Sequence, residues 1–127
     1  MQIFILNGGK GTRVKSISKN KPKCMIEFNG IPFINYQINL LYKKGFKEIV
    51  FCLGYKSKKI INHLKKLKLK GLDINYVVEK KTLGTAGALI NAKKKMKNFF
   101  FVTYGDSFLD IDYKKIFFKH QKKMNAV

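Results

Sequence analysis

A glycine-rich stretch near the N-terminus has the residue types that bind phosphate. The stretch GGKGTR follows directly on the apolar run MQIFIL. Because glycine has no Cβ atom, the backbone N–H groups of Gly8, Gly9 and Gly11 can approach an anion closely. Thr12 adds a hydroxyl group, and Arg13 adds a planar guanidinium that can pair with phosphate oxygens. The stretch therefore predicts a site for a phosphate or a chain of phosphates.

Several known loops of this kind do not match the stretch. A P-loop would need a glycine where the chain has Phe4, and the dinucleotide-binding fingerprint would need one at Val14. The GxxG clamp of KH domains joins two helices, whereas GGKG follows a strand-like run. Taken alone, the glycines leave a flexible strand-to-helix turn open as the alternative.

The elements that must position this loop alternate between two hydrophobic periods. Short β-branched and aromatic runs predict buried strands at Gln2–Leu6, Glu48–Leu53, Asp73–Val78 and Phe99–Thr103. Between them, apolar residues at three- and four-residue steps predict helices. These helices run from Pro32 to Gly45, from an N-cap at Ser57 to Gly71, from Leu83 to Met96, and onward from Asp112.

Strands that alternate with helices predict βαβ units, and hence an α/β fold. We expect a mainly parallel sheet with helices on both faces, in three layers, α/β/α. With 127 residues, the chain is long enough for one domain and short for two, so residues 1–127 are predicted to form a single domain. Ligands of such sheets bind at the carboxyl ends of the strands. The loops that follow the strands should therefore carry the functional residues.

The strongly basic composition gives only a weak indication of partners. The chain has 27 lysines and arginines against seven acidic residues, a formal charge of +20. Such a charge is typical of proteins that bind nucleic acids or anionic membranes. However, Arg13 is the only arginine, and the lysines form many short groups instead of one stripe. We interpret most of them as solvent-exposed helix faces and expect neither nucleic acid nor membrane as a partner.

The cysteines and the N-terminus favour a cytoplasmic location. Cys24 and Cys52 have no CxxC or Cys/His spacing, so we predict neither zinc nor a disulfide but two buried thiols. No apolar stretch reaches the roughly 18–20 residues of a membrane span. The N-terminal run lacks the charged region and cleavage site of a signal peptide.

The motifs in the predicted loops resemble the signature of the sugar-1-phosphate nucleotidylyltransferases, a family with a Rossmann-like, GT-A-like α/β fold. The resemblance is carried by GGKGTR, KPKCM and NGIPFI in that order, and by GY after the second predicted strand. It continues with E…LGTAGAL over Glu79–Leu89 and YGDSFLDID over Tyr104–Asp112. It extends over the whole chain and is most similar to the heptose- and mannose-1-phosphate guanylyltransferases.

This resemblance implies transfer of a nucleotidyl group from a nucleoside triphosphate, with GTP favoured, to a sugar 1-phosphate in cell-surface glycan biosynthesis. It implies two catalytic residues, Arg13 on the triphosphate and Lys23 on the reacting phosphates. The nucleotide-binding residues that it implies are Leu6, Asn7, Gly8, Gly9, Gly11, Thr12, Arg13, Lys23, Glu79, Gly84 and Thr85. Asn7 departs from the family, which usually has a small apolar residue there.

Magnesium is the cofactor that the resemblance implies, because negative charge accumulates on the leaving pyrophosphate. Of the acidic residues in GDSFLDID, Asp106 matches the metal ligand of the family. Asp112 is interpreted as the N-cap of the last helix, and Asp110 is left open. His63 and His120 fall within helical patterns, where we expect surface or boundary residues without a catalytic partner.

Glu79 is the residue that favours GTP. Guanine presents two adjacent donors, N1–H and N2–H₂, which one carboxylate can accept together, whereas thymine and uracil present one. The alternative is a strand-end carboxylate that pairs with Lys80 or Lys81.

The family's catalytic domain is about twice as long as this chain. The resemblance therefore implies a truncated domain, without the part that carries the sugar pocket and a second metal carboxylate. We expect the chain to bind nucleotide yet turn over poorly alone, and to self-associate or combine with a complementing C-terminal half. The alternatives are a catalytically incomplete nucleotide-binding fragment and a basic nucleic-acid-binding module.

Overall fold

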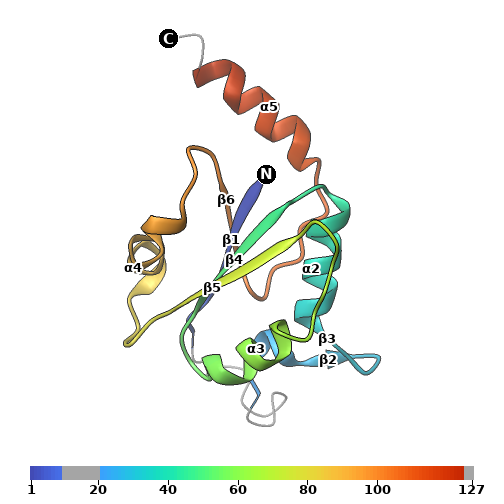
Figure 1. Cartoon of the computed structure of the whole chain (residues 1–127), viewed down its shortest axis with the longest axis vertical. Coiled ribbons are helices and arrows are strands. Elements are labelled where there is room, and N and C mark those ends of the chain that lie inside the picture. The colour runs from blue at the N-terminus through green and yellow to red at the C-terminus, as the bar shows by residue number, and fades with distance from the viewer. Residues whose placement is uncertain (10–20, 125–127) are drawn as a thin grey trace.

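Four parallel strands form the centre of the molecule (Figure 1). The structure is a computed structural model that describes residues 1–9 and 21–124. In sheet order, the strands are β5 (Asp73–Val78), β4 (Glu48–Leu53), β1 (Gln2–Asn7) and β6 (Phe101–Tyr104). Each strand is parallel to its neighbours. The predicted α/β fold with a mainly parallel sheet is confirmed.

Residues that alternate along the central strands define two buried faces of this sheet. Ile3 and Ile5 of β1 belong to one apolar cluster, and Phe4 and Leu6 belong to a second. Since consecutive side chains of a strand point to opposite faces, a strand covered on both sides has an unbroken apolar sequence, such as IFIL. The two clusters therefore mark the two helix-covered faces of a three-layer fold.

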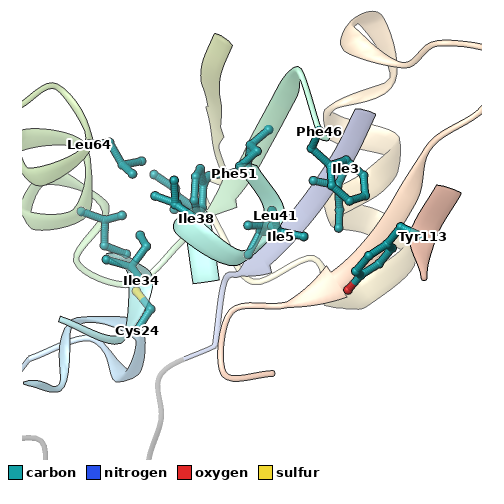
Figure 2. Packing of buried hydrophobic residues seen from close by; sticks show 13 residues of the cluster. Ile3, Ile5, Cys24, Ile34, Ile38, Leu41, Phe46, Phe51, Leu64 and Tyr113 are labelled. Atoms are coloured by element: carbon teal, nitrogen blue, oxygen red, sulfur yellow. The ribbon is translucent and has the colours of Figure 1, made fainter. Parts of the chain in front are cut away.

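One face is covered by α2 (Phe33–Lys43) and α3 (Ser57–Leu64). Ile34, Ile38 and Leu41 of α2 recur at three- and four-residue steps and are buried against the sheet (Figure 2). Full burial of each such side chain contributes about 1.5–3 kcal/mol. Tyr113, the first residue of α5 (Tyr113–Met124), is buried in the same cluster, and α5 then continues beyond the sheet (Figure 1).

Among the described helices, α4 (Gly84–Asn91) lies on the opposite face (Figure 1). Its Ala88 belongs to the apolar cluster of Phe4 on this face. Coverage is incomplete beside the edge strand β6, where Val102 is 42% exposed and Tyr104 is 53% exposed. The described helices therefore cover the edge of the sheet at β6 only in part.

The helices and strands lie where they are predicted, but several boundaries differ, and β1 extends one residue further, to Asn7. β6 begins two residues later than predicted and ends one residue later, at Tyr104. The predicted N-cap at Ser57 is wrong, because Ser57 is the first residue of α3 and Lys56, with φ +55°, is its N-cap. α3 also ends at Leu64 instead of Gly71, and α4 ends at Asn91, followed by the 3₁₀ turn η3 (Lys93–Lys95). No helix in the described part of the chain is both long and apolar enough to cross a membrane.

A small hairpin before α2 was not predicted. It consists of β2 (Glu27–Phe28) and β3 (Ile31–Pro32), joined through Gly30 at φ +74°. Two-residue strands are too short to produce a hydrophobic period, so the sequence pattern cannot indicate them. The 3₁₀ turn η2 (Lys23–Met25) precedes the hairpin and buries Cys24 in the core beside α2.

The amino end of the sheet is closed by the side chain of Gln2, which is 1% exposed. Its Nε2 donates to Glu48 Oε1 at 2.9 Å and to the carbonyl of Lys95 at 2.7 Å, and its Oε1 accepts from the N–H of Lys97 at 3.0 Å. Lys97 Nζ also lies 2.6 Å from Glu48 Oε2. Burial alone would raise the pKa of Glu48, but the hydrogen bonds from Lys97 and Gln2 outweigh it and lower the pKa.

Candidate functional site

A cavity of about 280 Å³ lies at the carboxyl ends of β1 and β6. From β1 the chain continues to β4 and β5 on one side, and after β5 it crosses back to β6 on the other side of β1, so the strand order reverses at β1. Such a topological switch point is where open α/β sheets bind their ligands. The cavity therefore occupies the place that the fold class predicts.

The structure brings the described members of the predicted site together around this cavity. From β1 and the loop after it come Leu6, Asn7, Gly8 and Gly9. Lys23 comes from η2, Glu79 and Asp106 come from the loops after β5 and β6, and Gly84 and Thr85 come from the start of α4. Gly11, Thr12 and Arg13 lie outside the described residues. The roles of all these residues stay predictions.

Lys23 and Asp106 face each other at the cavity, with Lys23 Nζ 3.3 Å from Asp106 Oδ2. Lys23 is the first residue of η2, a turn anchored by the buried side chain of Cys24. Asp106 lies in the turn that follows β6, and its side chain is 55% exposed. A pair this exposed contributes little to stability, about 0–1 kcal/mol. Lys23 and Asp106 can therefore give up this contact to bind a ligand with little loss of folding free energy.

The turn that carries Asp106 is held from inside the protein by Gln37 of α2. The N–H of Ser107 donates to the carbonyl of Tyr104 at 3.1 Å, which closes the turn. Gln37 Nε2 donates to that same carbonyl at 2.9 Å and to the carbonyl of Ser107 at 2.7 Å. Gln37 is not among the site residues predicted from the sequence. The available signal was a polar residue between Ile34 and Ile38, within the apolar stripe of α2.

Asn7 supports the same turn from the side of β1. A Cβ atom at Gly105 would overlap the Asn7 carboxamide, so the side chain lies directly on the glycine. The N–H of Gly105 donates to the carbonyl of Leu6 at 3.0 Å, which continues the pairing of β6 with β1. Asn7 Nδ2 is buried and has no hydrogen-bond partner among the described residues.

Gly54 of the GY motif allows the loop after β4 to contact the loop after β1. A Cβ atom at Gly54 would lie 2.7 Å from the carbonyl oxygen of Gly8 and 2.9 Å from its Cα. Real Cβ atoms do not approach backbone so closely, so the position requires glycine while the loop after β1 keeps its course.

Glu79 lies between this loop and the start of α4. It is 9% exposed, and a Cβ atom at Gly8 would lie 3.1 Å from its Oε1. Its Oε2 accepts a hydrogen bond from the N–H of Leu83 at 3.2 Å, at the N-terminus of α4. The positive end of the helix dipole stabilises a carboxylate there. In the described part of the chain, no ion pair joins Glu79 to Lys80 or Lys81, the alternative that the sequence left open.

The other polar residues singled out in the sequence lie away from the cavity. Asp112 Oδ1 accepts from the N–H of Lys115 at 3.0 Å, so its prediction as the N-cap of α5 is confirmed. Asp110 forms a surface ion pair with Lys44 at 2.5 Å. His63 shares a hydrogen bond with Asn35 at 2.6 Å, and burial lowers its pKa. These contacts are structural.

The two cysteines are buried, as predicted, and are unsuited to nucleophilic chemistry. Burial raises the pKa of the Cys24 thiol to about 12 and that of Cys52 to about 11. The reactive species is the thiolate, which is scarce at neutral pH for such values. Neither cysteine is among the residues that line the cavity.

Asp106 would supply a divalent cation with a single carboxylate, so tight binding would need a ligand that supplies further oxygens. Among the described residues, nowhere do three or more His, Cys, Asp or Glu side chains gather in a way that could bind a metal. Zinc sites need such a group. Mg²⁺ instead is commonly bound by one or two carboxylates, the phosphates of a substrate and water. The single exposed carboxylate of Asp106 fits Mg²⁺ delivered with a polyphosphate.

The chain is similar to known proteins over almost its whole length. Residues 3–127 match the family described as Nucleotidyl transferase. The D-glycero-α-D-manno-heptose 1-phosphate guanylyltransferase of Campylobacter jejuni is 42% identical over 116 residues, which are 91% of this chain and 52% of that protein. The mannose-1-phosphate guanyltransferase of Yarrowia lipolytica is 37% identical over 130 residues, covering 99% of this chain and 36% of that one.

The fold is also similar to that of a solved structure with a bound nucleotide analogue. HddC from Yersinia pseudotuberculosis, complexed with GMP-PN, is similar with a TM-score of 0.83 and 35% identity. The similarity covers 93% of this chain and 53% of HddC, so the chain spans about half the length of that protein and of the Campylobacter enzyme. Since one family matches nearly every residue and its fold is the fold observed, this chain belongs to the nucleotidyl transferase family.

Proposed function

We propose that the chain is the nucleotide-binding part of a sugar-1-phosphate nucleotidylyltransferase that uses GTP and Mg²⁺ in cell-surface glycan biosynthesis. The names of its relatives, which are guanylyltransferases for heptose and mannose 1-phosphates, support the substrate class. The two free thiols, Cys24 and Cys52, are in keeping with the cytoplasm as its location.

The observation that carries this proposal is the meeting of Lys23 and Asp106 at the switch-point cavity. The two residues are 83 positions apart in sequence, yet their charged groups lie 3.3 Å apart. Phosphoryl transfer depends mainly on positioning and on positive charge around the phosphates. A lysine supplies such charge directly, and a carboxylate supplies it by holding Mg²⁺.

In the proposed reaction, an oxygen of the sugar 1-phosphate attacks the α-phosphorus of GTP. A new P–O bond forms as the bond to the β-phosphate oxygen breaks, and pyrophosphate leaves with the bonding electrons. Arg13 and Lys23 would bind and orient the phosphates. Mg²⁺ held by Asp106 would neutralise part of the charge on the triphosphate. Holding the two reactants in line is worth about 7–11 kcal/mol of such a barrier.

We propose Glu79 as the residue that favours guanine. Its Oε2 already accepts the N–H of Leu83, which fixes the orientation of the carboxylate. The remaining acceptor capacity of the two oxygens is available to the N1–H and N2–H₂ donors of guanine. A carboxylate held in this way favours a base with two adjacent donors over uracil, which has one.

We further propose that the chain requires a complementing half, or a second copy, at the edge of β6. This edge carries Val102 and Tyr104 with 42% and 53% exposure, beside the 36% exposed ring of Phe100. An unpaired edge strand with apolar side chains favours association with another polypeptide. The relatives, about twice as long, contain additional chain that could cover it.

Calorimetry with GTP and Mg²⁺ tests the nucleotide site. We expect binding by the 127-residue chain, weaker binding of UTP, and loss of GTP binding in Arg13→Ala. Lys47→Ala removes an exposed charge at the opposite end of the sheet, so this variant should bind like the wild type. Tight binding of duplex DNA with a steep salt dependence, and none of GTP, would instead favour the basic nucleic-acid-binding module.

A pyrophosphate-release assay tests the requirement for a second half. The chain alone, with GTP, Mg²⁺ and heptose or mannose 1-phosphate, should turn over poorly. A version extended with the C-terminal half of a relative should turn over robustly. Robust turnover by the 127-residue chain alone would contradict this part of the proposal.

A further inference from the structure

Gln37 is a polar residue at a core position of α2. It is 2% exposed, and the other buried residues of the helix are Ile34, Ile38 and Leu41. Both of its donor contacts go to the turn after β6, to the carbonyls of Tyr104 and Ser107. Its Oε1 is buried and has no hydrogen-bond partner among the described residues.

Packing alone does not account for this side chain. A buried amide whose oxygen lacks a partner is less favourable than an apolar side chain of equal volume. A methionine or leucine would therefore serve the core better. A flipped amide would also place Oε1 against two carbonyl oxygens, so the orientation is fixed by the turn. What distinguishes Gln37 from an apolar residue is the pair of hydrogen bonds that its Nε2 donates to the turn.

The group that this donor end controls is Asp106. Tyr104 and Ser107 are the first and last residues of the turn, and Asp106 is its third. Gln37 donates two hydrogen bonds to the turn from α2, while Asn7 packs on Gly105 from the side of β1. The carboxylate itself is 55% exposed and contacts Lys23. Its direction is therefore set by the backbone of the turn.

We propose that Gln37 is a positioning residue: it holds the turn Tyr104–Ser107 so that Asp106 faces Lys23 and the cation of a bound nucleotide. The inference rests on the proposed function, because it assigns Asp106 to that cation. Residues that orient a metal ligand are commonly worth 10–100-fold in metal affinity. We expect an effect of about that size here.

Gln2 offers a matched control at the other end of the sheet. It is also a glutamine, 1% exposed, and also donates through Nε2 to two acceptors. In contrast to Gln37, its Oε1 accepts a hydrogen bond as well. Gln2→Met should therefore reduce the melting temperature more than Gln37→Met, and should leave the cavity unchanged.

The experiment compares wild type, Gln37→Met and Gln2→Met in three measurements. The first is hydrogen exchange of the Ser107 amide without ligand, which should become at least about tenfold faster only in Gln37→Met. The second is broadening of the Asp106 amide signal by Mn²⁺ alone, which should weaken only in that variant. The third is the affinity for GTP with Mn²⁺, which should fall about 10–100-fold in the same variant.

The results separate this inference from the proposed function. A wild type that takes up Mn²⁺ at Asp106 but binds no GTP would contradict the function, and the first two measurements would still decide the role of Gln37. Unchanged Ser107 exchange in Gln37→Met would overturn the positioning role. Equal losses of affinity in Gln2→Met would also overturn it, because the effect would then follow from stability alone.

Discussion

The polar groups at the two ends of the parallel sheet differ in how completely they are hydrogen-bonded. At the amino end, both heteroatoms of the Gln2 amide have hydrogen-bond partners, and Lys97 lies 2.6 Å from Glu48, which has 15% side-chain exposure. At the carboxyl end, Asn7 Nδ2 and Gln37 Oε1 are buried without partners among the described residues. The charged pair there, Lys23 and Asp106, is longer at 3.3 Å, and its carboxylate is more exposed, at 55% against 15% for Glu48.

This difference separates structure from function within one sheet. A polar network whose members are all satisfied contributes to stability and has no capacity left for a ligand. Buried amide atoms without partners cost stability, and an exposed ion pair contributes little to it. Both are found at the end where the loops form a cavity. Proteins commonly depart from such local rules at functional sites. Three substitutions test whether the two ends are independent.

The largest effect is expected from Lys23→Met. Among the described residues that line the cavity, Lys23 is the only cationic one. Loss of a charge-assisted hydrogen bond costs about 1.5–3 kcal/mol, which corresponds to roughly 10–150-fold weaker binding of GTP with Mg²⁺. Thermal stability should barely change, because the ion pair with Asp106 is exposed. Calorimetry and a melting curve measure the two quantities.

Lys21→Met is the matched control for this change. Lys21 lies two residues before Lys23 and forms a surface ion pair with Glu27 at 2.7 Å, away from the cavity. Both variants lose one positive charge from a chain of net charge +20. If both lose the same affinity, the overall charge attracts the nucleotide, and the carboxyl end is not a specific site.

A smaller effect, shared between stability and binding, is expected from Gly54→Ala. The new Cβ atom would meet the backbone of Gly8 at 2.7 Å, and backbone cannot move aside as a flexible side chain can. Such overpacking costs about 1–3 kcal/mol of folding free energy, and here it also displaces the glycine loop. Denaturant unfolding should show the loss, and calorimetry should show weaker GTP binding.

Gly9→Ala sharpens this prediction. A Cβ atom at Gly9 has no neighbour within 4 Å, so the substitution should leave stability unchanged. Any loss of nucleotide affinity in Gly9→Ala therefore reports the cavity alone. A Gly54→Ala variant as stable as the wild type would show that the loop after β1 is free to move, and that its close approach to Gly54 is not required.

The sequence predicts the framework of this molecule well because parallel strands covered on both faces leave a clear pattern. β4 and β5 have the predicted bounds, and β1 extends one residue further. The predicted start of β6 is too early because Phe99 and Phe100 extend the apolar run of the strand towards the N-terminus. Its start is determined by the pairing of Phe101 with Ile3. Such a long-range register cannot be read from local composition.

The sequence predicts site residues at strand ends and misses the residues that support them. GY and the glycine loop were recognised as motifs, but only the fold shows that Gly54 touches Gly8. Gln37 is a polar residue in an apolar stripe, and its acceptors lie 67 and 70 positions further along the chain. Hydrogen bonds of this range depend on topology, so they become visible only when the elements are assembled.

The smallest effect concerns the amino end, where Glu48→Gln should change stability and not binding. The pKa of Glu48 is lowered in the folded protein from its ordinary value of 4.5. A lowered folded pKa means that the charged form stabilises the fold above pH 4.5, and that this stabilisation is lost as the pH falls through the folded pKa. At pH 7, we expect Glu48→Gln to unfold about 1 kcal/mol more easily.

The pH dependence of that difference is the informative measurement. Because the glutamine does not titrate, the gap between wild type and variant should stay constant above pH 4.5 and shrink as the solution becomes more acidic. The partner Lys97 is 66% exposed, so salt should reduce the gap as well. Affinity for GTP should equal that of the wild type at pH 7, since Glu48 lies at the end of the sheet opposite the cavity.

A gap in stability that persists unchanged to pH 3 would mean that Glu48 contributes through packing and not through its charge. A loss of nucleotide affinity would show that the two ends are coupled through β1 and β4.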